Sequence, residues 1–415
     1  MKYVILLGDG MADYPIPELG GATVLEAAHT PAMDRIAAQG VIGLIDTIPS
    51  GCAPGSDVAN MTILGYDPRR IRAGRGALEA VAMGVVLSPG GGESAFRCNL
   101  VTLSKNEAGQ RVMEDFTAGH ISSEEAAILV RHLDHELGGE GVIFRPGVGY
   151  RNLMIWKGAP EEPEEMETTP PHDITGKVIY DYLPRGRGSE FLQELIDRSM
   201  IVLADHPVNR ERVSRGDRPA ASIWPWGQGG APRMKKLTEL YGISGAMISA
   251  VDLLKGIGIC AGLEVLPVQG ATGYVDTNYR GKAERALEWL EKGDFIFLHV
   301  EAPDEMGHEG NVKGKIKAIE NFDEMVVARV LEGLESSGYE YRIMVLSDHA
   351  TPIKVGTHVS DPSPFAVLSS RKEENRGLGC NFGEKSAADS RILVSPGYIL
   401  MEYFVGNWRS FIDRF

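Results

Sequence analysis

Short apolar runs alternate with amphipathic segments along most of the chain. The runs are rich in Val, Ile, Leu and Phe and lack regular polar positions, which is typical of strands buried on both faces. We expect strands at residues 3–7, 245–250, 263–268, 295–299, 342–346 and 365–368. Helical spacing and capping signals predict helices at residues 30–40, 251–262, 282–290, 315–335 and 396–405. This alternation predicts an α/β fold with a doubly wound, parallel sheet.

The amino-acid composition of the chain changes between residues 88 and 235. This stretch is rich in Gly, Pro and charge, and has its own strand signals at 96–103, 153–156 and 200–203 and helix signals at 122–137 and 188–197. A chain of 415 residues is also too long for one typical domain. We therefore predict a core domain made of residues 1–87 and 236–415, with a second α/β domain, residues 88–235, inserted into it.

Charge and composition exclude several kinds of partner. The net charge of −15 counts against nucleic acid and anionic membranes, so a negatively charged substrate needs a local basic pocket. The four cysteines form no C-x-x-C pair, which favours a reduced protein without a zinc knot. The N-terminal apolar run is too short for a signal peptide, and no segment is long enough to span a membrane. We expect a cytoplasmic protein.

Carboxylates and imidazoles follow several of the predicted strands. Each one alone could be a turn aspartate or a solvated histidine, but the carboxyl ends of parallel strands meet at one edge of a sheet. A D-x-x-x-H spacing also places both side chains on one side of a helix. Three aspartates and three histidines are what two divalent metal ions would need. The candidate ligands are Asp9, Asp304, His308, Asp348, His349 and His358.

Ser56 is the candidate nucleophile. Gly55 before it suits a tight turn into a helix, and the N-terminus of a helix attracts anions such as a phosphoryl group. The alternative is that the Ser56 hydroxyl only caps that helix. The surrounding residues do not match G-x-S-x-G, so an α/β-hydrolase elbow is not indicated.

These motifs together resemble a known signature. Gly8-Asp9-Gly10, Pro54-Gly55-Ser56-Asp57, Asp304 with His308, Asp348-His349 and His358 look like the metal and nucleophile motifs of the alkaline phosphatase superfamily. Longer strings resemble the cofactor-independent (2,3-bisphosphoglycerate-independent) phosphoglycerate mutases of the shorter, archaeal type. Examples are PGSDVANMTILGYDP, GRGALEA, GATGYVDTNYRGK and HVEAPDEMGHEG. The resemblance runs through nearly the whole chain and implies an alkaline-phosphatase-like sheet with an inserted domain.

The resemblance also implies roles for particular residues. It implies that 3-phosphoglycerate and 2-phosphoglycerate are interconverted through a phosphoserine at Ser56, without 2,3-bisphosphoglycerate. One ion is expected at Asp304, His308 and His358, and the other at Asp9, Ser56, Asp348 and His349. Manganese is the expected metal, with zinc, cobalt or magnesium as alternatives. Lys255 resembles the active-site lysine, and Lys282 competes for that role. The inserted domain is expected to grip the substrate through Arg75, Arg97, Arg151 and Arg212.

Three alternatives stay open at this point. A plain phosphomonoesterase, or a mutase for another sugar phosphate, would use the same metal ligands. A small-molecule kinase such as a homoserine kinase is less favoured, because the chain contains no G-x-x-x-x-G-K-[ST] motif. The sequence gives neither the preferred metal nor the oligomeric state.

Overall fold

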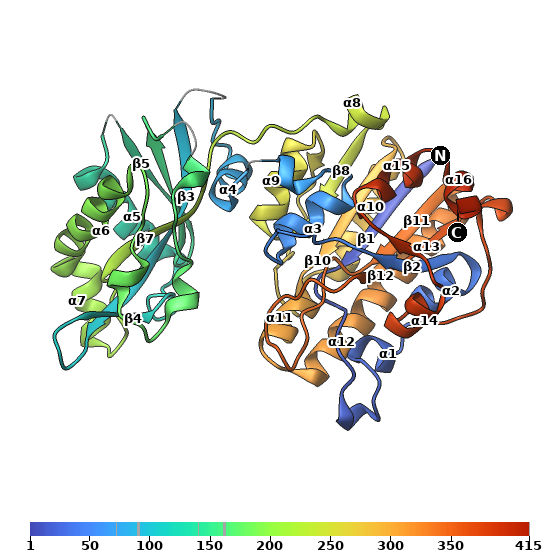
Figure 1. Cartoon of the computed structure of the whole chain (residues 1–415), viewed down its shortest axis with the longest axis horizontal. Coiled ribbons are helices and arrows are strands. Elements are labelled where there is room, and N and C mark those ends of the chain that lie inside the picture. Colours follow the sequence, from blue (N-terminus) through green and yellow to red (C-terminus); the bar gives the residue numbers. More distant parts are fainter. Residues whose placement is uncertain (72, 89–91, 140, 161–162, 415) are drawn as a thin grey trace. The chain divides into compact units, whose positions relative to one another are not determined.

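The chain folds into two compact units. The computed structural model describes residues 1–71, 73–88, 92–139, 141–160 and 163–414 (Figure 1). One unit consists of Met1–Ile71 and Met234–Phe415, and the other of Arg72–Arg233. None of the helices in the described ranges is long and apolar enough to cross a membrane.

The second unit begins earlier than the sequence suggested. We expected the boundary at residue 88, but helix α4 (Arg75–Ala82) already belongs to the second unit. Ala77 and Ala80 of α4 share a small apolar cluster with Ala95 of strand β3 (Glu93–Lys105). Gly76 allows this close approach, because a Cβ there would lie only 2.7 Å from the carbonyl oxygen of Ala95.

The first unit is built on an eight-stranded sheet with the order β13-β2-β12-β11-β1-β10-β8-β9. Strand β1 (Lys2–Gly8) lies in its middle and pairs in parallel with β10 (Phe295–Val300) and β11 (Tyr341–Leu346). The other strands are β2 (Val41–Ile45), β8 (Gly245–Ile248), β9 (Glu264–Val265), β12 (Ser363–Ser369) and β13 (Leu393–Val394). The expected sheet is therefore present, except that β12 runs antiparallel to both β11 and β2.

Helices cover both faces of this sheet (Figure 1). Val4 and Leu6 of β1 share one core with residues of α2, α10 and α12. On the other face, Tyr3 packs edge-on against Phe404 of α15. The helices of this unit are α1 (Val24–Ala27), α2 (Pro31–Gln39), α3 (Ser56–Ile63), α8 (Leu237–Tyr241), α9 (Asp252–Cys260), α10 (Tyr279–Leu290), α11 (Ala302–His308), α12 (Val312–Phe322), α13 (Ala328–Ser337), α14 (Glu384–Asp389), α15 (Ile399–Val405) and α16 (Trp408–Arg414).

The long helix expected at residues 315–335 contains a π-helical turn at Asp323–Val327, between α12 and α13. Asp323 is buried there and accepts hydrogen bonds from the backbone N–H groups of Ala32 (3.1 Å) and Met33 (2.7 Å). It thereby caps α2, whereas Thr30, which stands in the N-cap position, makes no side-chain capping bond. A residue almost 300 positions away in the sequence performs this task, so local capping rules could not find it.

The second unit has a five-stranded antiparallel sheet in which β4, β3, β6 and β5 follow one another and β7 also pairs with β3. Besides β3, the strands are β4 (Arg111–Asp115), β5 (Val142–Val148), β6 (Arg151–Lys157) and β7 (Ser222–Gly229). Helices α5 (Ser123–Leu137) and α6 (Ser189–Ala204) share a core with the sheet, and α7 (Pro207–Ser214) follows α6. The strand expected at residues 200–203 is wrong: α6 continues through it, because Leu192, Leu195, Ile196 and Leu203 form one buried helical face.

Candidate metal and nucleophile site

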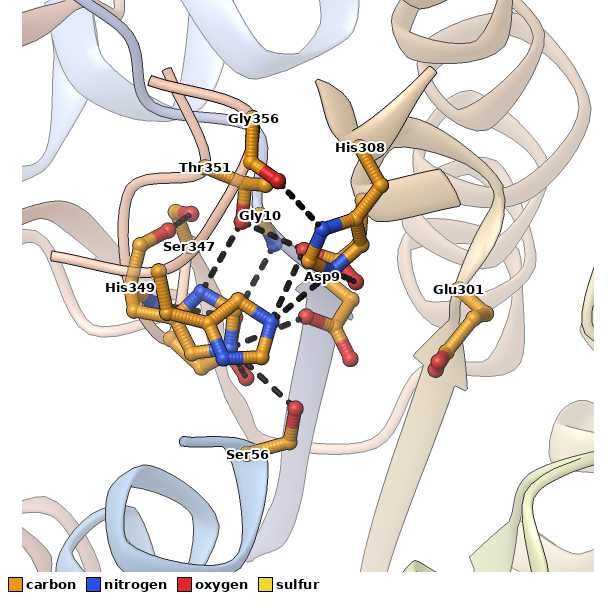
Figure 2. Close-up of polar contacts among 12 residues, drawn as sticks. Asp9, Gly10, Ser56, Glu301, His308, Ser347, His349, Thr351 and Gly356 are labelled. Carbon is orange, nitrogen blue, oxygen red and sulfur yellow. Dashed lines mark hydrogen bonds and ion pairs between the residues drawn. The ribbon is translucent and has the colours of Figure 1, made fainter. Parts of the chain in front are cut away.

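The candidate ligands meet at the carboxyl edge of β1, β10 and β11 (Figure 2). Asp9 follows β1 directly, and Asp348 and His349 follow β11 after one intervening residue, Ser347. Asp304 and His308 lie one turn apart on α11, at the end of β10. We expected His358 to follow a strand, but it precedes β12. It reaches the same edge because β12 runs antiparallel to β11.

The first ligand group consists of Asp304, His308 and His358. The Nε2 atom of His308 lies 3.1 Å from Asp304 Oδ2 and 3.1 Å from His358 Nε2, and His358 Nε2 lies 3.6 Å from Asp304 Oδ1. The opposite ring atom of His308, Nδ1, is 3.0 Å from the carbonyl oxygen of Gly356. A hydrogen bond from Nδ1–H to that carbonyl would leave Nε2 free to bind a metal.

The second group surrounds the Nε2 atom of His349. Ser56 Oγ lies 3.1 Å from it, Asp348 Oδ2 3.3 Å and Asp9 Oδ1 3.4 Å. The Asp348 carboxylate is held in place by the N–H groups of Gly10 (3.1 Å) and His349 (2.9 Å) and by the side chain of Asn60 (3.1 Å). Asn60 also donates to the carbonyl of Ser56, and so it ties the start of α3 to this ligand.

Ser56 does not cap its helix. Helix α3 begins at Ser56 itself, and Gly55, in the N-cap position, has an extended backbone with no side-chain cap. The Ser56 hydroxyl is thus free of the capping bond and is directed at His349 (Figure 2). The capping alternative considered from the sequence is therefore wrong.

The charge balance of the cluster suits cations. Burial, followed by the neighbouring carboxylates of Asp348, Glu301 and Asp304, raises the pKa of Asp9 well above its usual range. Asp9 Oδ1 is buried and is without a hydrogen-bond partner among the described residues. The donors are carboxylate oxygens and imidazole nitrogens with no thiolate, which fits divalent ions such as Mn²⁺ or Zn²⁺. These residues therefore fit the metal sites that the sequence suggested.

The sequence did not single out two residues that support the ligands. Thr351 is fully buried, donates a short hydrogen bond to Asp304 Oδ1, and has its Oγ1 3.3 Å from His349 Nδ1. His299, the last residue of an apolar run, lies 2.7 Å from Asp9 Oδ2. Thr351 stands only two positions after His349, which is the one local signal that could have identified it.

The two candidate lysines differ in their surroundings. Lys255, near the start of α9, forms an ion pair of 2.8 Å with Asp252 and is partly exposed. Lys282 of α10 is completely buried, and its Nζ donates to the backbone carbonyl of His299 (3.1 Å). Burial lowers the pKa of Lys282 to about 8. The contact with His299 brings Lys282 to the end of the strand beside Asp9.

The four candidate arginines belong to the second unit. Arg97 pairs with Glu79 at 2.6 Å and lies 4.7 Å above the ring of Trp226. Arg75, the first residue of α4, lies with Arg97 beside Gly227. Arg151 is exposed and lies 4.8 Å from the ring centre of Tyr150.

Arg212 does not have the surroundings expected of a substrate-binding residue. It is only 3% exposed, and its guanidinium donates to Glu125 (2.5 Å) and to the carbonyls of Ala118 (2.7 Å) and Arg218 (3.0 Å). Each of its three nitrogens is thus engaged within the unit. These contacts favour a role for Arg212 in the packing of α5 and α7 over a role in substrate binding.

The sheet and the ligands at its carboxyl edge define an α/β protein with a candidate metal site beside a serine. A model of the 2,3-bisphosphoglycerate-independent phosphoglycerate mutase family matches residues 37–209. Mutases of that name from Methanosarcina barkeri and, as a probable assignment, Geobacter sulfurreducens are 56% and 50% identical to this chain. The alignments cover 93% and 97% of this chain and 95% and 99% of the relatives. The chain belongs to the 2,3-bisphosphoglycerate-independent phosphoglycerate mutases.

Two solved structures extend the similarity to the fold. A protein from Pyrococcus horikoshii is 30% identical with a TM-score of 0.80, covering 98% of this chain and 97% of its own. A cofactor-independent phosphoglycerate mutase from Thermoplasma acidophilum is 26% identical with a TM-score of 0.63, covering 97% and 99%.

Proposed function

We propose that the protein interconverts 3-phosphoglycerate and 2-phosphoglycerate through a phosphoserine at Ser56, in the cytoplasm and without 2,3-bisphosphoglycerate. Family membership supports the reaction. The observation that carries the mechanism is the position of the Ser56 hydroxyl. It does not cap α3, and it lies 3.1 Å from His349 Nε2. The four free cysteines agree with a reducing compartment.

Two divalent ions complete this proposal. Asp304, His308 and His358 would hold one, and Asp9, Ser56, Asp348 and His349 the other. When bound, the ions lower the pKa of the Ser56 hydroxyl and neutralise the charge of the phosphoryl group. Manganese is our first choice because the family resemblance implies it, with zinc, cobalt or magnesium as alternatives that the same thiolate-free ligands could bind.

The chain's own residues then transfer the group in two steps. Ser56 Oγ loses its proton and attacks the phosphorus of 3-phosphoglycerate, the bond between phosphorus and the C3 oxygen breaks, and the C3 oxygen takes up a proton. The 2-hydroxyl of the retained glycerate next loses its proton and attacks the phosphoserine, the bond between phosphorus and Oγ breaks, and Oγ takes up a proton. Water must be kept out between these steps, since otherwise the product is free phosphate. Lys255, or Lys282 as the competing residue, would supply positive charge at the site, and Lys282 reaches the carbonyl of His299, the residue that contacts Asp9.

We further propose that Arg75, Arg97 and Arg151 of the second unit bind the substrate's carboxylate or phosphate. The planar guanidinium group matches both groups with paired hydrogen bonds. The stacking of Arg97 on Trp226 and its ion pair with Glu79 hold its side chain in one orientation. Arg212 is the least favoured of the four candidates, because its nitrogens are already engaged.

The decisive experiment offers manganese-loaded protein 3-phosphoglycerate alone and follows the products by ³¹P NMR. We expect 2-phosphoglycerate as the main product without added 2,3-bisphosphoglycerate. Ser56→Ala should abolish the reaction but retain the fold, whereas Ser410→Ala, which changes an exposed serine of the same unit, should be fully active. Activity of more than a few per cent in Ser56→Ala would exclude Ser56 as the nucleophile.

The same assay tests the alternative function. A phosphomonoesterase with this site would release mainly inorganic phosphate, and that result would replace the mutase proposal. Arg97→Ala should raise the ratio of free phosphate to 2-phosphoglycerate, because glycerate would leave before the second transfer. Arg145→Ala is the matched control, since this arginine of the second unit is 48% exposed and its nearest carboxylate is 3.9 Å away.

A further inference from the structure

His299 is a fully buried imidazole at the end of β10, where it pairs in register with Leu7 of β1. Its two ring nitrogens contact three residues. Nδ1 lies 3.2 Å from Ser249 Oγ, whereas Nε2 lies 2.7 Å from Asp9 Oδ2 and, at a longer distance of 3.3 Å, from Glu301 Oε2. The ring nitrogen that carries the proton decides whether His299 donates a hydrogen bond to the serine or to the candidate metal ligand.

The direction of these hydrogen bonds follows from Asp9, because an ionised carboxylate that binds a metal can only accept a hydrogen bond from Nε2–H. The N–H of Val251 donates to Ser249 Oγ (3.0 Å), which leaves the hydroxyl proton of Ser249 available for another acceptor. The nearby acceptor for that proton is His299 Nδ1. Once Nδ1 accepts, the proton of the neutral ring must sit on Nε2, and Nε2–H then donates to Asp9 Oδ2.

This hydrogen bond determines which oxygen of Asp9 remains available. Oδ2 is occupied by His299, whereas Oδ1 is buried, has no hydrogen-bond partner among the described residues, and lies 3.4 Å from His349 Nε2. We propose that His299, held in one tautomer by Ser249, is a positioning residue that fixes the Asp9 carboxylate with Oδ1 toward the metal site. The effect of His299 on catalysis rests on the proposed function, whereas its effect on the orientation of the Asp9 carboxylate does not.

A competing role for His299 is direct binding of an additional cation. Ligand atoms of Asp9, His299 and Glu301 do lie within 4.8 Å of one another, and Figure 2 shows Glu301 on the other side of Asp9 from His349. However, the buried ammonium of Lys282 lies 3.1 Å from the carbonyl of His299. An extra cation there would be repelled by Lys282, which favours the positioning role.

Metal binding tests the proposal with three variants. His299→Leu removes the donor, His299→Gln keeps an N–H group at a similar reach, and Ser249→Ala removes the group that fixes the tautomer. Manganese binding is measured by calorimetry, and bound metal is counted by elemental analysis. For one of the two ions we expect an affinity loss of about 10–100-fold in His299→Leu, at most about threefold in His299→Gln, and an intermediate loss in Ser249→Ala.

Controls separate this role from a general effect on folding. Ser369→Ala is the matched control for Ser249→Ala, because Ser369 is also a buried serine of the first unit but donates to Glu374. It should bind both ions as the parent protein does. Rescue by glutamine but not by leucine is an outcome that simple packing of a buried ring would not give.

Three results would overturn the proposal. Parent-like affinity in His299→Leu would leave His299 with a packing role only. Three bound ions in the parent protein, and two in both His299 variants, would make His299 a metal ligand. Equal losses in His299→Gln and His299→Leu would remove the role of the N–H group. If the parent protein binds metal but does not form 2-phosphoglycerate, the proposed function fails while the metal-affinity result for His299 still stands.

Discussion

Lys315 of α12 offers a sharp test of how the first unit holds its site together. Its side chain is completely buried, and its ammonium group donates to Asp13 Oδ2 (2.8 Å) and to the carbonyls of Ala12 (3.2 Å) and Thr351 (2.9 Å). The first two acceptors lie on the segment after Asp9, and the third lies just after His349. Lys315 therefore joins the two segments that carry these ligands.

The substitution Lys315→Met removes the charge but fills most of the space, so that little of its cost arises from a cavity. It leaves the buried Asp13 carboxylate without its cation, which typically costs about 3–5 kcal/mol. Asp13 keeps hydrogen bonds from the N–H groups of Tyr14 (2.8 Å) and Ile353 (3.1 Å), which favours the lower half of that range. In a unit of about 250 residues, this corresponds to a fall in Tm of roughly 6–16 °C.

Chemical denaturation and calorimetry would measure this loss. The double variant Lys315→Met/Asp13→Asn should recover at least about 2 kcal/mol relative to the sum of the single variants, because no unpaired charge is left. Lys317→Met is the matched control on the same helix. Lys317 is 64% exposed and its ion pair with Glu320 is 3.7 Å long, so the expected change is below about 0.5 kcal/mol.

The reasoning would be refuted by a Lys315→Met variant that unfolds within about 1 kcal/mol of the parent protein. It would also be refuted by strictly additive single and double variants, because the cost would then not come from the unpaired carboxylate.

Three further predictions follow from other parts of the molecule. Dialysis against a chelator should abolish the mutase activity and manganese should restore it, whereas full activity in metal-free protein would contradict a metal-dependent site. Arg212→Ala should lower the free energy of unfolding of the second unit by about 2–4 kcal/mol, because it breaks the buried bonds to Glu125 and to two backbone carbonyls. In the folded fraction, the ratio of phosphate to 2-phosphoglycerate should stay unchanged, and a raised ratio would restore Arg212 as a substrate-binding residue. Burial raises the pKa of Asp323 from 3.8 to about 6, so the native carboxyl keeps a proton that the unfolded chain has released. The free energy of unfolding should therefore fall by up to about 3 kcal/mol as the pH rises from about 3 to 7, and Asp323→Asn should remove this slope in urea titrations.

Much of the first unit could be read from the sequence. Strands β1, β10 and β11 are buried on both faces, so they appear as continuous apolar runs, and the residues that follow them must gather at one edge. The four-residue spacing of Asp304 and His308 needs only one helical turn to bring them together. These features depend on the spacing of residues that are close in the chain, so they can be predicted from the sequence alone.

Other features depended on partners that are distant in the chain. Ser56 is the first residue of α3, and its hydroxyl contacts His349 and does not cap the helix. His358 reaches the site only because β12 runs antiparallel to β11. Arg212 is of a residue type that often binds anionic ligands, but its guanidinium is buried and forms an ion pair with Glu125 of α5. A hydroxyl, a guanidinium or an imidazole can serve a ligand or the fold equally well. Which of the two it serves is decided by the side chains that packing brings within about 3 Å, and only the tertiary structure determines those.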